Sequence, residues 1–300
     1  MNSDFNHRSY ELHQKHFSEN FDQQTLNSWK QKDTVDYWRH ENMYKTLLPL
    51  ISNYPDASWL TVGDGRYGTD ANYLITNGLK NVVASDISDT LLKIAKQDNF
   101  ISEYKVENAE KMSFEDNSFD FVLCKEAYHH FPRPTIALYE MIRIARKAVV
   151  LIEPLDKNIN FSKETFFVKS LRSITNSILL SLKGINKYEN FEDVGNYIFT
   201  TSEREINKIA IGLNLKKTYF KHQNDFYLKG AESEKMIENG PVRKAISKKI
   251  NLYNLMSKIG LIQYGLLISI IPKIDLEENC TRSLMKNQFD EYLLPVNPFV

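Results

Sequence analysis

The chain has 300 residues, of which 42% are hydrophobic and 25% are charged, an ordinary composition for a globular protein. Lysine plus arginine and aspartate plus glutamate number 38 each, so the net charge is zero and we expect no broad basic face that binds nucleic acid. The two cysteines, Cys124 and Cys280, are too few for a disulfide framework or a metal cluster, so we expect no metal site and a reducing, cytoplasmic setting.

The first 55 residues are predicted to form a helical N-terminal cap. They are largely polar, contain apolar clusters at 35–38 and 43–51, and show no strand pattern before Pro55 ends the segment. The polar residues 1–10 predict no signal peptide. The longest apolar run, 261–271, is far shorter than the roughly 20 residues of a membrane span, so no transmembrane helix is expected.

Residues 56–156 alternate between strand and helix patterns and are predicted to form the core domain. Strands that alternate with helices are typical of a doubly wound α/β fold with a parallel sheet. Pro134 stands at the start of the third helix, where proline is tolerated. The expected strands are 59–62, 81–85, 101–106, 119–124 and 147–152, and the expected helices are 69–76, 89–96 and 134–146.

Residues 157–300 are predicted to supply a helical lid or substrate region, the last strands of the sheet and an irregular C-terminal tail. Residues 161–182 suggest one long helix with apolar and basic residues. Two interpretations stay open for it, a substrate lid packed on the core and a helix resting on a membrane surface. The further expected elements are a helix at 202–213, a strand from 215 toward 227, helix at 235–259 with a break at 240–241, a strand at 264–271 and a tail from 275.

A glycine loop at 63–68, with the sequence GDGRYG, follows the first expected strand and precedes the first expected helix. Gly63 and Gly65 allow a sharp turn and a close approach of the backbone to a ligand. Asp86 ends the next strand, where a carboxylate can accept hydrogen bonds from ribose hydroxyls. The pattern predicts a nucleotide-type cofactor, and taken alone it also fits a nicotinamide-dependent oxidoreductase.

Residues 108–120, with the sequence NAEKMSFEDNSFD, lead directly into the strand at 119–124, and His129-His130-Phe131 follows it. In these segments the chain resembles the class I S-adenosylmethionine-dependent methyltransferases, in particular those that act on small molecules. The resemblance covers 59–154 and extends more loosely to the strand near Leu266. It implies a Rossmann-like doubly wound sheet of about seven strands with an antiparallel last strand, with N-terminal helices and a helical insertion after the fifth strand.

The resemblance implies S-adenosyl-L-methionine as the cofactor and assigns its contacts. Gly63 and Gly65 would pass under the methionine moiety, and Asp86 would hold the ribose hydroxyls. Asn108 would contact the adenine by its side chain. The expected cofactor-binding residues are Gly63, Asp64, Gly65, Gly68, Asp86, Ile87, Asn108, Ala109 and Lys125.

The glycine loop departs from the family pattern at two positions. Thr61 stands where the family usually has an acidic residue, and Tyr67 stands where a third glycine usually falls. Asp64 or Asp70 could supply the missing charge near the methionine ammonium. The two departures also leave open a non-catalytic, methyltransferase-like binding module.

Three residues after the fourth strand are candidates for the catalytic base. A hydroxyl acceptor must lose its proton on methylation, and histidine titrates in the range that suits this task. His129 and His130 are two candidates, and a structural role is open for each of them. Glu126 is the third candidate, with a contact to the cofactor as the alternative.

The sequence therefore predicts an S-adenosylmethionine-dependent methyltransferase acting on a small-molecule acceptor, by O-methylation of a sugar or another secondary metabolite. The alternatives are an NAD(P)-dependent oxidoreductase and a non-catalytic binding module. We expect a small-molecule substrate and no nucleic acid partner. Peripheral contact with a membrane stays open, and no pattern specifies an oligomeric state.

Overall fold

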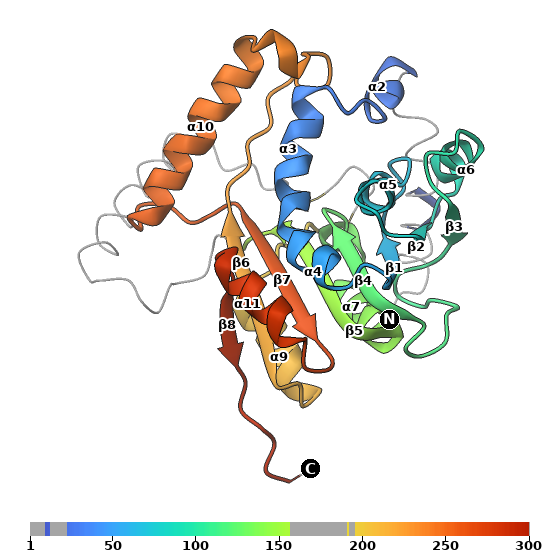
Figure 1. The fold of residues 1–300 in the computed structure, drawn as a ribbon, viewed down its shortest axis with the longest axis vertical. Helices are drawn as coiled ribbons and strands as arrows, with labels where there is room; N and C mark the ends of the chain where they lie inside the picture. Colours follow the sequence, from blue (N-terminus) through green and yellow to red (C-terminus); the bar gives the residue numbers. More distant parts are fainter. Residues whose placement is uncertain (1–9, 13–22, 157–190, 192–195, 300) are drawn as a thin grey trace.

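A single mixed sheet organises the computed structural model, which describes residues 10–12, 23–156, 191 and 196–299 (Figure 1). The described residues form an eight-stranded sheet in the order β3-β2-β1-β4-β5-β7-β6-β8. The pairs among β1 to β5 are parallel, whereas β7 runs antiparallel to both β5 and β6, and β8 antiparallel to β6. The doubly wound fold with an antiparallel last part is thus confirmed.

The parallel half of the sheet follows the predicted alternation closely. Helix α7 ends two residues earlier than expected, because β5 already begins at Ala145. The strands are β1 Ser58–Val62, β2 Asn81–Asp86, β3 Glu103–Val106, β4 Phe119–Lys125 and β5 Ala145–Pro154, and the helices are α5 Thr69–Thr76, α6 Thr90–Gln97 and α7 Pro134–Ile144.

Residues 23–53, in the N-terminal region that was expected to be helical, form helices and one 3₁₀ turn. Thr34 caps α3 by accepting a hydrogen bond from the backbone N–H of Tyr37 at 3.1 Å. The elements are α2 Gln23–Ser28, α3 Val35–Tyr44, the 3₁₀ turn η1 Lys45–Leu47 and α4 Leu48–Asn53.

The antiparallel half contains two elements that the sequence prediction missed. The tail from residue 275 was expected to be irregular, and this was wrong, because α11 and β8 lie in it. A break before Pro241 was expected and is confirmed, although the residues before it form only the 3₁₀ turn η3 Met236–Glu238. The other elements are α9 Glu203–Gly212, β6 Lys217–Gln223, α10 Pro241–Lys258, β7 Leu266–Pro272, α11 Glu278–Lys286 and β8 Asp290–Leu293.

Two further expectations were not tested. The helix expected at 161–182, with both interpretations of it, lies outside the described residues. The division of the chain at 1–55, 56–156 and 157–300 also stays a prediction.

The core lies on both faces of the sheet, because successive strand residues point to opposite sides. On one face, Trp59 and Phe121 pack in a cluster that includes α4, α5, α6 and α11 side chains. On the other face, Leu60 and Val122 pack in a second cluster with α7 and α9. Parallel strands covered on both faces require continuous apolar runs, which is why their positions were readable in the sequence.

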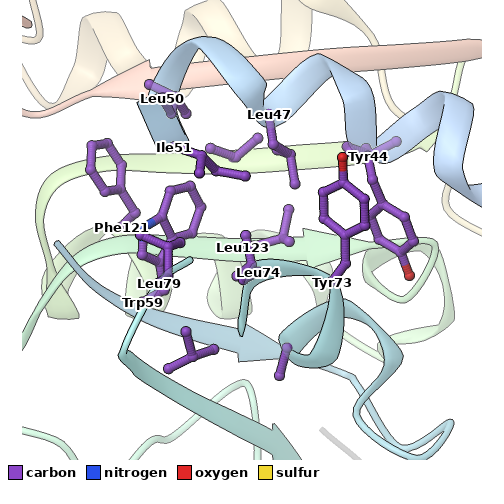
Figure 2. Close-up of a cluster of buried hydrophobic side chains, with 14 of the residues drawn as sticks. Tyr44, Leu47, Leu50, Ile51, Trp59, Tyr73, Leu74, Leu79, Phe121 and Leu123 are labelled. Carbon is purple, nitrogen blue, oxygen red and sulfur yellow. The ribbon is translucent and has the colours of Figure 1, made fainter. Parts of the chain in front are cut away.

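The first cluster fixes the N-terminal helices to the sheet (Figure 2). Leu50 and Ile51 lie over Trp59 and Phe121, which stack with ring centroids 4.7 Å apart, and Leu47 lies over Leu123. Full burial of each large apolar side chain contributes roughly 1.5–3 kcal/mol. The N-terminal helices are therefore part of the core and hold a defined position over the strand ends.

The tail is expected to contribute to stability through α11. Leu284 is completely buried in the first cluster, so Leu284→Ala should lower the free energy of unfolding by about 2–5 kcal/mol. Leu293 in β8 is 76% exposed, and Leu293→Ala is the matched control, with an expected change within about 0.5 kcal/mol. Urea denaturation of the two variants measures both values. Equal stability would show that α11 does not belong to the core.

Candidate functional site

The glycine loop between β1 and α5 requires glycine at two positions. Gly63 has a φ of 76°, and a Cβ atom there would lie 2.4 Å from the Cβ of Ala127. Gly68 has a φ of 65° and immediately precedes α5, and a Cβ there would lie 2.8 Å from Ile101. Both positions therefore favour glycine by conformation and by space.

Tyr67, at the position where the family has a third glycine, adopts a backbone conformation that glycine favours. Its φ is 59°, in the left-handed region that a glycine would adopt freely. Such a conformation costs of the order of 1 kcal/mol in a residue with a side chain. The Tyr67 ring is buried in the first core cluster, and its packing offsets this cost.

Asp64, one of the two residues expected to supply the acid that position 61 lacks, lies inside the loop and contacts Thr61 itself. The Thr61 hydroxyl donates to Asp64 Oδ2 at 2.8 Å. The Asp64 carboxylate also accepts the backbone N–H groups of Asp70 at 3.1 Å and Ala71 at 2.9 Å. Asp64 is buried and joins the end of β1 to the first turn of α5. Its predicted contact with the cofactor stays a prediction.

Asp86 lies at the end of β2, beside the glycine loop. Its Oδ2 accepts the backbone N–H of Gly65 at 2.9 Å, and its Oδ1 accepts that of Ser88 at 2.8 Å. Burial raises the pKa of Asp86 to about 6, although these N–H groups act in the opposite direction. Ile87 also donates its backbone N–H to this carboxylate. The two oxygens together have about four lone pairs, so the carboxylate keeps room for a hydrogen bond from a ligand. Ile87 follows and is half-buried.

The loop that carries Asn108 and Ala109 is held by a buried carboxylate. Asn108 Oδ1 accepts the Glu110 N–H at 2.9 Å, and Ala109 is half-buried. Glu110 accepts the backbone N–H of Arg133 at 2.8 Å, its Nε at 2.6 Å, and the Tyr10 hydroxyl at 2.6 Å. These bonds join the loop to the segment before α7 and to the N-terminal residues 10–12.

Lys125, the last residue of β4, and Glu126, which follows it, belong to a compact charged cluster. Lys125 Nζ lies 3.6 Å from Asp70 Oδ1 and 3.2 Å from Glu126 Oε2. Burial lowers the pKa of Lys125, but the two carboxylates outweigh it and the net shift is upward. Burial would raise the pKa of Glu126, but Lys125 and His40 hold it well below its usual range. Both side chains are therefore charged at neutral pH.

Helix α3 reaches this cluster with a side chain that the sequence did not assign. His40 Nδ1 lies 3.2 Å from Glu126 Oε2, and His40 Nε2 lies 3.3 Å from a guanidinium nitrogen of Arg66. Arg66 belongs to the glycine loop and also donates to Asp36 Oδ2 at 2.8 Å. Helix α3 is thus joined by polar contacts to the glycine loop and to the end of β4.

Asp36 also contacts Arg39, an arginine of its own helix α3. Arg39 donates to Asp36 Oδ1 at 2.7 Å and pairs with Asp225, to which its Nε donates at 3.1 Å. Asp36, Arg39 and His40 have the spacing i, i+3, i+4 of one helix face, which is the signal that the sequence offered for them.

A buried carboxylate holds His129 at the end of the sheet. His129 Nδ1 lies 2.6 Å from Glu153 Oε2. Glu153 ends β5, is completely buried, and its Oε1 accepts the backbone N–H groups of Ala127 and Tyr128 at 3.0 Å each. The sequence analysis missed Glu153, although an acidic residue at the end of an apolar strand is itself a signal.

A pocket of about 320 Å³ brings the three candidate bases together. The rings of His129 and His130 are 3.9 Å apart between centroids. The predicted cofactor residues of the glycine loop, β2 and the 108–109 loop do not line this pocket. Its lining residues are Asp36, Arg39, His40, Arg66, Glu126, His129, His130, Pro154, Tyr227 and Glu232.

Neither metal-ligand clusters nor membrane spans occur in the part of the chain that the structure describes. No group of three or more histidine, cysteine and acidic side chains is placed there to hold a metal ion. No helix in the same residues is long and apolar enough to cross a bilayer. Cys124 and Cys280 are both buried free thiols.

Comparison with known proteins identifies the family of the core. Residues 60–152 match the family model described as a methyltransferase domain. No curated protein sequence matches the chain significantly. Similar solved structures include the magnesium protoporphyrin IX methyltransferase of Synechocystis PCC 6803 with bound S-adenosylhomocysteine, at 12% identity over 88% of this chain and 99% of that chain, with a TM-score of 0.46. A methyltransferase of Methanosarcina mazei matches at 19% identity over 76% and 98%, with a TM-score of 0.44.

The affinity for the cofactor is expected to depend on pH through Asp86. If its carboxylate accepts ribose hydroxyls, binding needs the ionised form, so affinity for S-adenosylhomocysteine should decrease as the pH falls below about 6, by up to about tenfold per pH unit. Calorimetric titration from about pH 5 to about pH 8 measures this. Asp86→Asn should bind weakly and with a flat pH profile. A native protein with equal affinity across this range would contradict the assignment.

Proposed function

Residues 60–152 are a class I S-adenosylmethionine-dependent methyltransferase domain, and from this premise we propose that the enzyme methylates a hydroxyl group of a small polar acceptor, such as a sugar or another secondary metabolite. The observation that carries the proposal is the Glu153–His129 pair on the wall of the pocket. It provides an oriented base, which hydroxyl acceptors need for methylation at neutral pH.

The residues around the glycine loop fit the cofactor. The Asp86 carboxylate can accept a hydrogen bond from the ribose. Gly63 and Gly68 have no side chains that would displace the loop. S-Adenosylmethionine, when bound, supplies a methyl group on a positively charged sulfur, which is already activated for transfer. The protein therefore has to position the acceptor and manage its proton.

In the proposed mechanism, His129 removes the acceptor proton. A carboxylate can only accept, so Nδ1 carries the proton that faces Glu153 and the lone pair stands on Nε2. With the cofactor bound, His129 Nε2 would take the hydroxyl proton as the acceptor oxygen gains the methyl group, and the thioether of the demethylated cofactor would be the leaving group. The imidazolium that results lies against the Glu153 carboxylate, which stabilises its charge.

The pocket walls support a polar acceptor with several hydroxyl groups. Glu126 and Glu232 are carboxylates that can accept hydroxyl hydrogens, and Arg39 and Arg66 are donors. The Tyr227 ring is 49% exposed and offers a flat apolar surface of the kind on which a sugar ring packs. We assign Glu126 to binding and not to proton removal, because its low pKa makes it a weak base.

The proposed function predicts unequal roles for the two adjacent histidines. His129→Ala should lower turnover about 10²- to 10⁴-fold while affinity for S-adenosylhomocysteine stays within about twofold. His130→Ala is the matched control, because it removes a neighbouring imidazole that lacks the contact with Glu153, and its effect should be below about tenfold. Formation of S-adenosylhomocysteine is measured with a panel of sugars, phenols and amines. The proposal fails if only amines react, or if both variants retain full activity.

Glu153→Gln tests the positioning role. In this variant the amide oxygen still accepts the backbone N–H groups of Ala127 and Tyr128. The amide NH₂ then donates to His129 Nδ1, and the imidazole proton moves to Nε2. Turnover should fall about 10²- to 10⁴-fold, because the base then lacks its lone pair. Nitrogen NMR of the imidazole reports the tautomer without any acceptor. If this substitution leaves the tautomer and the turnover unchanged, Glu153 has only a structural role.

A further inference from the structure

Helix α10 is attached to the rest of the molecule along one side only. Its inward side chains Val242, Ile246 and Ile250 belong to a small cluster with Val35 of α3 and Phe226. Figure 1 shows α10 alongside α3, extending beyond the end of the sheet. Along the 18 residues of the helix, only Ile246 and Ser257 are buried. Among the residues that the structure describes, no apolar cluster covers the opposite face.

The outward face carries large apolar side chains. Leu252, Leu255 and Ile259, just past the end of the helix, are 47%, 59% and 55% exposed. At 100° per residue the three lie within about 60° of one another and form one stripe. Adjacent exposed apolar residues on one face are uncommon on a surface that contacts only water.

Basic residues lie on the same face as this apolar stripe and beside it. Helix α10 contains five basic residues and no acidic residue, although the whole chain has zero net charge. Lys244, Lys248 and Lys258 are exposed, and no ion pair is formed by them among the described residues. The five basic residues are Arg243, Lys244, Lys248, Lys249 and Lys258.

We propose that the outward face of α10 binds the surface of a lipid bilayer that contains anionic lipids. Leu252, Leu255 and Ile259 would enter the boundary between headgroups and acyl chains, and the lysines would lie at the headgroups. Each lysine near an anionic bilayer increases binding roughly fivefold, and the apolar side chains add to this. Lysines in particular point to a lipid surface, since they match diffuse negative charge and not one fixed acidic partner.

The bilayer position would bring the pocket close to the membrane. Helix α10 packs on α3, and α3 supplies Asp36, Arg39 and His40 to the pocket wall. The loop before α10 supplies Tyr227 and Glu232. The surface assignment itself stands on α10 alone and does not depend on the proposed function.

Vesicle binding tests this surface. The full chain is sedimented with neutral phosphatidylcholine vesicles and with vesicles that contain about one-third phosphatidylserine. Binding is expected only to the anionic vesicles and should weaken as salt is raised. No binding to either vesicle, or equal binding to both, would overturn the proposal.

Two variants locate the binding face. The triple variant Lys244→Gln, Lys248→Gln and Lys258→Gln should reduce partitioning roughly 100-fold. The matched control changes three exposed lysines elsewhere, Lys80→Gln, Lys93→Gln and Lys286→Gln, and should bind within about threefold of the native chain. Equal losses in both triple variants would show that only overall charge matters, and the proposal would be wrong.

The apolar contribution has its own variant. Leu252→Ser with Leu255→Ser should weaken vesicle binding at least tenfold while circular dichroism and S-adenosylhomocysteine binding stay unchanged. Light scattering measures the oligomeric state and tests whether this face binds a second copy of the chain. A native dimer that this double variant converts to a monomer would assign the face to a second copy of the chain, and the lipid proposal would be wrong.

Discussion

One buried carboxylate, that of Glu153, sets the geometry on which the pocket depends. It is completely enclosed and accepts two backbone N–H groups from the turn after β4 while it faces His129. A buried carboxylate without these partners would be strongly unfavourable, so the turn and the histidine are held together with it. Glu126 begins this turn with a φ of 50°, a conformation that the surrounding contacts maintain. Strand β5 therefore fixes the position of His129.

The glycine loop departs from the family pattern at positions 61 and 67. Asp64 joins Thr61 to the first turn of α5, and Tyr67 has a positive φ and a buried ring. Helix α3 then closes the site through His40 and Asp36, which contact Glu126 and Arg66. The departures from the family pattern thus have counterparts in this chain, and the loop retains its shape.

The sequence predicted β1 to β5 well because strands buried on both faces have continuous apolar runs. Helix α11 was missed because Cys280 and Leu284 are its only buried residues, and β8 because an exposed edge strand shows no alternation. For the candidate site, the glycine loop, Asp86 and the two histidines were recognisable as local motifs. The polar contacts of the site could not be recognised in the sequence, because partners such as Arg39 and Asp225 are 186 positions apart and only the fold brings them together.

A crystal structure of the complex with S-adenosylhomocysteine would locate the sulfur relative to His129. We expect the ribose hydroxyls on the Asp86 carboxylate and the sulfur at the edge of the pocket that His129 lines, with Glu153 still on Nδ1. A sulfur that faces away from this pocket, or is separated from His129 by protein, would contradict the account.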